Sequence, residues 1–100
     1  MDTFYIGSQL KILFEITADG FTQDSSTYTI VLKCGGVTKT DGRSHIVTNN
    51  SKHYLLVDTS EFNAGVLTAT VTASVTDNDF TSNVRREVEV VELCHLRETP

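Results

Sequence analysis

The amino-acid sequence predicts an all-β fold, an antiparallel β-sandwich of six to seven strands, with a small barrel as the alternative. Three observations predict it. Apolar and polar residues alternate along several segments, turn signals recur about every eight to twelve residues, and no long segment shows the 3.6-residue period of an amphipathic helix. The one proline is the last residue, where it interrupts no strand.

Length and charge limit what the chain can do. Its 100 residues suit one domain, with a core at about 9–94 and short tails on both sides. Eight basic and 13 acidic residues give a net charge of −5, which disfavours a nucleic-acid partner. No run approaches the ~20 apolar residues of a membrane span, and the start lacks the pattern of a signal peptide. We therefore expect no membrane partner and a cytoplasmic location on synthesis.

Two early segments alternate clearly. In QLKILFEITA, at 9–18, the residues on one face are Leu10, Ile12, Phe14 and Ile16. In TYTIVLKC, at 27–34, they are Tyr28, Ile30, Leu32 and Cys34. Period-two alternation is typical of a strand with one face in a core, so both segments are expected to pack their apolar faces inward.

The middle of the chain predicts short strands and tight turns. Gly35 and Gly36 lie between apolar residues and predict a hairpin, because both glycines accept positive φ. A short strand at 37–40 follows, and SHIVT and HYLLV predict two more at 44–48 and 53–57. In DTSEFNAG, at 58–65, capping residues precede Phe62, which predicts one helical turn whose phenyl ring closes an end of the core.

The last part of the chain predicts a long β-hairpin, 66–75 and 84–93, around a polar loop at 76–83. The first strand places its apolar residues on one face, namely Leu67, Ala69, Val71, Ala73 and Val75. In the second strand the phase slips, so a bulge near Val90 or Val91 is expected to keep Val88, Val90, Val91 and Leu93 near the core. The alternative is that this end is covered on both faces.

The two cysteines allow two interpretations. Cys34 and Cys94 lie 60 residues apart, which resembles the inter-sheet pair of immunoglobulin domains. The chain has no tryptophan to pack against such a bridge, and two small apolar thiols in a reducing compartment explain the pair as well.

No pattern of catalytic or metal-binding residues is specific. Asp77, Asp79 and Asn83 could offer oxygen ligands to calcium, but their loop lacks the spacing of an EF-hand, and we expect them to cap backbone groups instead. The triad residue types Asp41, Ser44 and His45 are present, yet adjacent strand residues face opposite ways. The three histidines, His45, His53 and His95, match no zinc spacing. We expect no enzyme activity, metal or cofactor.

Aromatic residues offer weaker signals. Phe4, Tyr5 and Phe21 are expected to close the ends of the sandwich, with a partner-binding patch as the alternative. A carbohydrate-binding or adhesion module usually exposes aromatic residues on one sheet face, and Tyr54 is the residue that such a module would use here.

One part of the sequence resembles a known family. In YLLVDTSEFNAGVLTATVTASVTDNDFTSNVRREVEVVEL, at 54–93, a strand ending in Asp-Thr and a short turn precede G-V-L-x-A-x-V-x-A and D-x-D-F…R-x-E-V. This resembles small immunoglobulin-like modules of prophages in gut bacteria, similar to the N-terminal sandwich domains of tailed-phage baseplate and fibre proteins. The resemblance implies an immunoglobulin-like sandwich, no catalytic residues and a structural role in a virion.

The functional expectation is a non-enzymatic structural or interaction module, with a carbohydrate-binding or adhesion module as the alternative. Its partners would be other protein subunits, including copies of itself. The expected contact loop contains Asp77, Asp79, Phe80 and Asn83. The short strands at 37–40 and 45–48 are expected to lie at sheet edges, where an exposed strand can pair with another chain.

Overall fold

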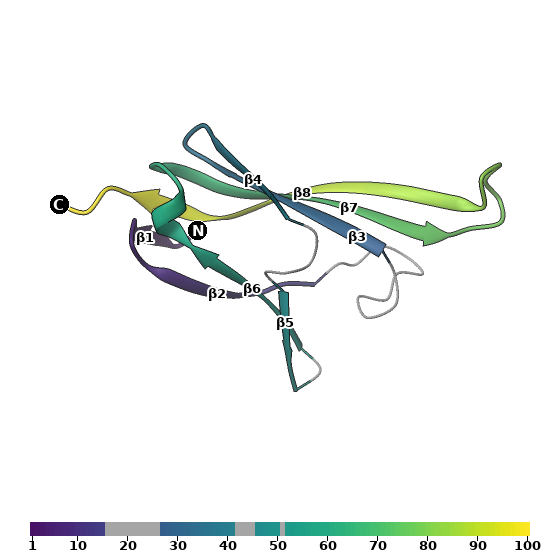
Figure 1. Cartoon of the computed structure of the whole chain (residues 1–100), viewed down its shortest axis with the longest axis horizontal. Coiled ribbons are helices and arrows are strands. Elements are labelled where there is room, and N and C mark those ends of the chain that lie inside the picture. The colour runs from purple at the N-terminus through teal and green to yellow at the C-terminus, as the bar shows by residue number, and fades with distance from the viewer. Residues whose placement is uncertain (16–26, 42–45, 51) are drawn as a thin grey trace.

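The computed structural model describes residues 1–15, 27–41, 46–50 and 52–100, with the side chains of Thr27 and Asp41 left aside. These residues form an all-β, sandwich-like fold of two sheets, which confirms the predicted fold class, with eight strands among the described residues rather than the predicted six to seven (Figure 1). The strands are β1 (Thr3–Tyr5), β2 (Gln9–Leu13), β3 (Thr27–Cys34), β4 (Val37–Asp41), β5 (Ile46–Asn49), β6 (Lys52–Asp58), β7 (Gly65–Thr76) and β8 (Val84–Arg97). One sheet has the order β1-β8-β7-β3-β4 and the other β2-β6-β5.

The two chain ends are part of the larger sheet. β1 pairs in parallel with His95–Arg97 of β8, and the Ile6 N–H donates to the Arg97 carbonyl at 2.8 Å. The prediction of tails at both ends is therefore wrong, and the sheet is mixed rather than purely antiparallel. A three-residue strand is too short to show a period, so no pattern in the sequence predicts this pairing.

The core follows the alternation read from the sequence. The predicted inward residues of β3 and β7 are all buried, as are Leu10 of β2 and Phe14 just after it, and Ile12 is half-buried. Ile16 lies outside the described residues. Burying one side chain of the size of Val, Leu, Ile or Phe stabilises the fold by about 1.5–3 kcal/mol, so these faces hold the sheets together.

The β3–β4 turn explains the Gly-Gly pair. Gly35 and Gly36 have φ of 59° and 81°, as predicted. A Cβ at Gly35 would lie 2.6 Å from the Asn63 Cβ and 2.7 Å from the Ala64 carbonyl oxygen, whereas Gly36 has open space around it. Gly35 is therefore required both by its backbone conformation and by the close approach of the 63–64 backbone.

The segment after β6 forms the predicted helical turn. A 3₁₀ turn spans Thr59–Glu61, and the Asp58 side chain caps it by accepting from the Ser60 N–H. Phe62 follows it and is only 4% exposed, which confirms that its ring closes the core. Gly65, with φ of 151°, then starts β7.

The second strand of the hairpin keeps only part of the predicted apolar set near the core. β7 and β8 pair with Val71 opposite Glu89 and Thr72 opposite Val88. Facing residues of an antiparallel ladder share a side of the sheet, so Val88 and Val90 lie on the outer face and are 63% and 64% exposed. Their expected place near the core is wrong. The same expectation is confirmed for Val91, which is opposite the buried Ala69, and for Leu93, which packs against the core.

The phase slip has a different position from the one predicted. Leu67 pairs with Cys94 but Thr68 pairs with Glu92, so the bulge leaves Leu93 unpaired rather than Val90 or Val91. Beyond this bulge Cys94 and Leu96 face the core. Before it, the even-numbered residues of β8 face outward.

The cysteines lie in one sheet. Cys94 is opposite Leu67, and Cys34 follows Lys33, which is opposite Thr68, so β7 runs between the two cysteines. Two strand spacings amount to about 9–10 Å, whereas a disulfide needs Cα atoms about 4.4–6.8 Å apart. Both thiols are buried and free, which confirms the interpretation as two small buried thiols and contradicts the inter-sheet bridge. Burial raises the pKa of both thiols.

Candidate functional site

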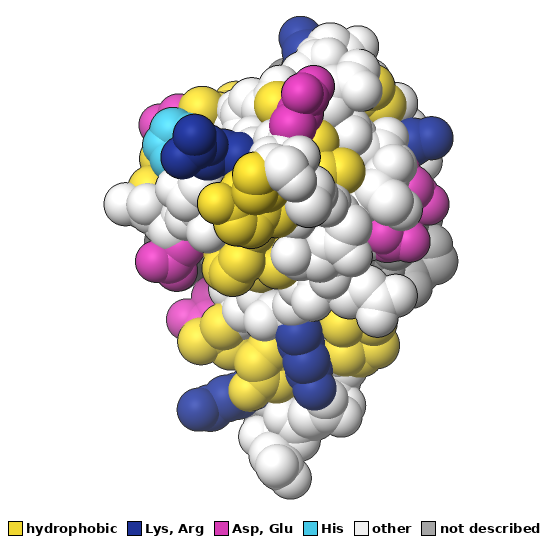
Figure 2. Space-filling view, turned by 90° about the vertical axis from the view of Figure 1, so that its left-hand side faces the viewer, with side chains coloured by type: hydrophobic (Ala, Val, Ile, Leu, Met, Phe, Trp, Pro, Cys, Tyr) yellow, Lys and Arg dark blue, Asp and Glu magenta, His cyan; other side chains and the backbone are white. Residues whose placement is uncertain are grey.

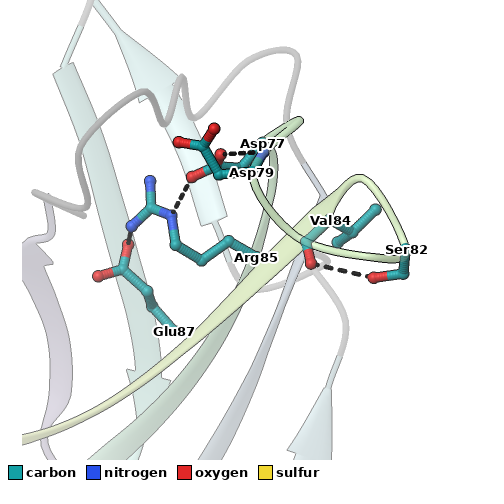
Figure 3. Close-up of polar contacts among 6 residues, drawn as sticks. All are labelled: Asp77, Asp79, Ser82, Val84, Arg85 and Glu87. Atoms are coloured by element: carbon teal, nitrogen blue, oxygen red, sulfur yellow. Dashed lines mark hydrogen bonds and ion pairs between the residues drawn. The ribbon is translucent and has the colours of Figure 1, made fainter.

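The hairpin loop is held by its own side chains. The Asp77 N–H donates to the Asn83 carbonyl at 3.0 Å, and the Asn83 N–H donates to the Phe80 carbonyl at 2.9 Å. Asp77 Oδ1 accepts from the Asp79 N–H at 3.0 Å (Figure 3), and Asn83 has a positive φ of 59°. The expectation that Asp and Asn cap backbone groups here is therefore confirmed for Asp77.

The other oxygen of Asp77 is also occupied. Its Oδ2 lies 3.1 Å from Arg85 Nε, and an Arg85 guanidinium nitrogen lies 2.8 Å from Glu87 Oε2 (Figure 3). Because both Asp77 oxygens serve the hairpin, a calcium site would have to break these contacts. Across the described part of the chain, no three acidic, histidine or cysteine side chains are grouped as metal ligands.

The four residues of the expected contact loop do lie together. Asp79, Phe80 and Asn83 are exposed, whereas Asp77 is half-buried under its ion pair. Phe80 is the apolar member and is 49% exposed. The loop stands at the end of the molecule farthest from both termini (Figure 1).

The outer side of β8 is a second exposed surface, which the sequence analysis missed. Beyond Val88 and Val90, Val84 is 45% exposed on the same face. β8 also has an open edge, the edge that faces away from β7. β1 pairs only with His95–Arg97 along it, so among the described residues no strand pairs with this edge from Val84 to Leu93. The phase slip in the sequence indicated this exposed face, because Val88 and Val90 lie on one face of a regular strand and Val91 and Leu93 on the other, so only one of the two pairs could face inward.

The edge strands occupy their predicted places. β4 ends the five-stranded sheet and β5 ends the three-stranded sheet. Both are short, at five and four residues, compared with the ten-residue stretch of β8 whose outer edge no described strand covers. Short edges offer a partner few backbone hydrogen bonds, so β8 is the larger candidate surface.

The other chemical candidates are not brought together. Ser44 and His45 lie outside the described residues, so the triad interpretation is not addressed. His53 is in β6 and His95 in β8, in different sheets, and the His53 ring bonds to the Thr48 hydroxyl at 2.9 Å.

A shallow groove of about 370 Å³ lies along β2 and β6. It is lined by Gln9, Leu10, Lys11, Leu56, Val57 and Asp58. The Asp58 carboxylate accepts from the Ser60 hydroxyl and N–H, which lowers its pKa. A carboxylate that is ionised and already bonded is a poor general acid.

The aromatic candidates differ in position. Phe4 is half-buried and packs against the core, as expected for end closure, but Tyr5 is 50% exposed and Phe21 lies outside the described residues. Figure 2 views the end of the molecule where the two termini lie and shows hydrophobic side chains at the surface among charged ones. Tyr54 is half-buried, and the Lys11 ammonium lies 4.9 Å from its ring centroid, which leaves that ring face closed to a sugar.

Comparison of the sequence with protein-family models found no match, and comparison of the chain with curated proteins and with solved structures found none either. None of the described segments is a helix with the length and apolar character needed to cross a bilayer.

Proposed function

We propose that the chain is a non-enzymatic interaction module that binds another protein through β8 and the adjoining hairpin loop. The observation that carries the proposal is the stretch of β8 from Val84 to Leu93, whose outer edge pairs with no strand of the described residues and which exposes three valines on one side of the sheet. An unpaired strand offers a row of backbone donors and acceptors, and proteins use such edges to add a strand from a partner.

The surface has the two parts that strand addition needs. The backbone of β8 would supply affinity, and the outward valines would give the added strand an apolar strip to pack against. Phe80 and the exposed polar groups of the loop lie at one end of this strip and would contact the partner beyond it. A lone exposed valine needs no explanation, but several in register along an open edge favour an interaction site.

The finer proposal is that this partner belongs to a virion, with the chain serving as a phage tail or baseplate component. It is supported by the resemblance of 54–93 to prophage sandwich modules, and the immunoglobulin-like assignment has the same support. The carbohydrate-binding alternative is less well supported, because the Lys11 ammonium covers one face of the Tyr54 ring.

In-cell photo-crosslinking tests the interaction module. A photoreactive amino acid would replace Val88 on the open edge or, as the matched control, Glu61 in the 3₁₀ turn at the other end. Both positions are exposed, so they differ only in the surface that they report.

We expect protein adducts from position 88 in the cells that naturally produce the chain and few from position 61. A tail or baseplate subunit in the adduct would support the virion assignment. Equal yields at the two positions, or no adduct from position 88, would refute the proposal.

A further inference from the structure

We infer that the open edge of β8 pairs in antiparallel fashion with β8 of a second copy of this chain, about a two-fold axis at Glu89. The inference rests on the proposed function and names its partner. The pairing would join two five-stranded sheets into one continuous sheet.

The backbone geometry identifies which residues face the open edge. The Asn83 carbonyl accepts from the Asp77 N–H across the hairpin, so it points toward β7. Backbone groups of successive strand residues point to opposite sides, so the Val84 carbonyl points to the open side, where the Ser82 hydroxyl donates to it at 3.2 Å (Figure 3). Continuing by twos, the residues that present their backbone to the open side are Arg86, Val88, Val90 and Glu92.

The outward side chains of these four residues form a self-complementary pattern. Read along the strand they are Arg86, Val88, Val90 and Glu92, all exposed. With the axis at Glu89, Arg86 faces Glu92 of the second copy and Val88 faces Val90 of the second copy. The axis repeats both pairs. Opposite charges and apolar pairs directly across an antiparallel ladder are the favourable combinations.

Neighbouring registers lose this match. Moving the axis by one residue to Val88 places Arg86 opposite Val90 and Glu92 opposite Val84. Moving it to Val90 places Glu92 opposite Val88. Each of these registers places a charge opposite a valine, so the outer face selects the axis at Glu89.

The register also fits the space along the edge. The pairs span Arg86 to Glu92, which ends before His95, where β1 occupies the same side of β8. Glu89 pairs with Val71 and so lies on the opposite face from the valines. On the axis it would meet Glu89 of the second copy, and this like-charge contact would keep the dimer weak.

Charge reversal in the purified full chain tests the register. Arg86→Glu places glutamates opposite each other at two symmetric positions, and Glu92→Arg places arginines there. We expect each change alone to weaken dimerisation roughly tenfold or more, and the double change Arg86→Glu/Glu92→Arg to restore it. Sedimentation equilibrium measures the dissociation constants, and circular dichroism confirms that each variant is folded.

Cysteine crosslinking gives an independent reading. Glu89→Cys would place two thiols directly opposite at a non-hydrogen-bonded pair, with Cα atoms about 4.5 Å apart, within disulfide reach. Glu87→Cys is the matched control, because its copies would lie about 13 Å apart along the strands. Cys34 and Cys94 are buried, so the wild-type chain should not crosslink.

Efficient crosslinking of the Glu89→Cys variant, but not of the Glu87→Cys variant, together with rescue by the double charge reversal, would support the pairing. A wild-type chain that stays monomeric up to millimolar concentration, or crosslinking at position 87 equal to that at 89, would overturn it. In-cell adducts between position 88 and a different protein would then still support the interaction module, so the two proposals fail separately.

Discussion

The two ends of this molecule form the hydrogen bonds of their polar groups in different ways. At the end near the termini, which we call the capped end (Gly7, Ser8, Thr59, Phe62), Thr59 is fully buried. Its hydroxyl donates to the Ser8 carbonyl at 2.7 Å and accepts from the Gly7 N–H at 2.9 Å. At the hairpin arm (Thr72–Val90), the loop bonds within itself and the outer face of β8 stays exposed.

The two ends differ in how far apart in the sequence their hydrogen-bonded residues lie. The capped-end hydrogen bonds join residues 51 and 52 positions apart, where β2 begins and its partner β6 ends, so they form only when these two distant segments come together. The Asp77–Asp79 bond spans two positions and can form in the hairpin alone. We conclude that the capped end depends on contacts between segments distant in the sequence, whereas the arm is a locally stabilised element available to a partner.

The largest expected contrast is between two phenylalanines. Phe62→Ala should destabilise the chain by about 3–5 kcal/mol, because it removes a buried ring and leaves a cavity. Phe80→Ala, at the exposed loop, should change stability by no more than about 0.5 kcal/mol. Urea unfolding at a protein concentration that keeps the chain monomeric measures both, and similar losses would contradict the division into two regions.

A smaller contrast compares two threonines. Thr59→Val should cost about 1–3 kcal/mol, because the Gly7 N–H and Ser8 carbonyl lose their hydroxyl partner in a buried site. Thr72→Val, on the half-exposed outer face, should stay within about 0.5 kcal/mol of the wild type. The same urea titration measures both variants, and a neutral Thr59→Val variant would show that the hydroxyl bonds to Gly7 and Ser8 do not stabilise the capped end.

The sequence predicted features that depend on neighbouring residues. Alternation placed Leu67, Val71 and Val75 in the core, and turn chemistry placed Gly35 and Phe62 correctly. Side-chain period and backbone φ are properties of a few adjacent residues, so a single sequence carries them.

Features set by distant contacts were missed. Nothing near Thr59 in the sequence indicates its bond to Ser8, and β1 is too short to show its pairing with β8. The phase slip in β8 allowed either Val88 or Val91 to face inward, and the register at Leu67 decided between them. The open edge follows from the strand order, in which β1 pairs only with His95–Arg97 of β8, and this order could be read only in the structure.

The smallest expected effect concerns acid stability at the capped end. The Ser60 hydroxyl and N–H donate to Asp58 and hold the pKa of its carboxyl below the ordinary value of 3.8. A lowered folded-state pKa gives a contribution to stability that is complete above pH 3.8 and is lost as the pH falls through the folded value. Asp58→Asn keeps a capping oxygen but does not titrate, so its stability should fall less steeply in acid.

Thermal unfolding of the wild type and the Asp58→Asn variant at several pH values between about 2.5 and 6 measures this slope. Ser60→Ala, which keeps the carboxylate but removes the hydroxyl donor, should show an intermediate slope, because the backbone N–H remains. The contact is at the surface, so solvent screens it and the change in midpoint should be the smallest of the three contrasts. Identical acid slopes for the three chains would mean that the Asp58 cap forms in the unfolded chain as readily as in the folded one, and that the capped end owes its stability to Thr59 and Phe62 instead.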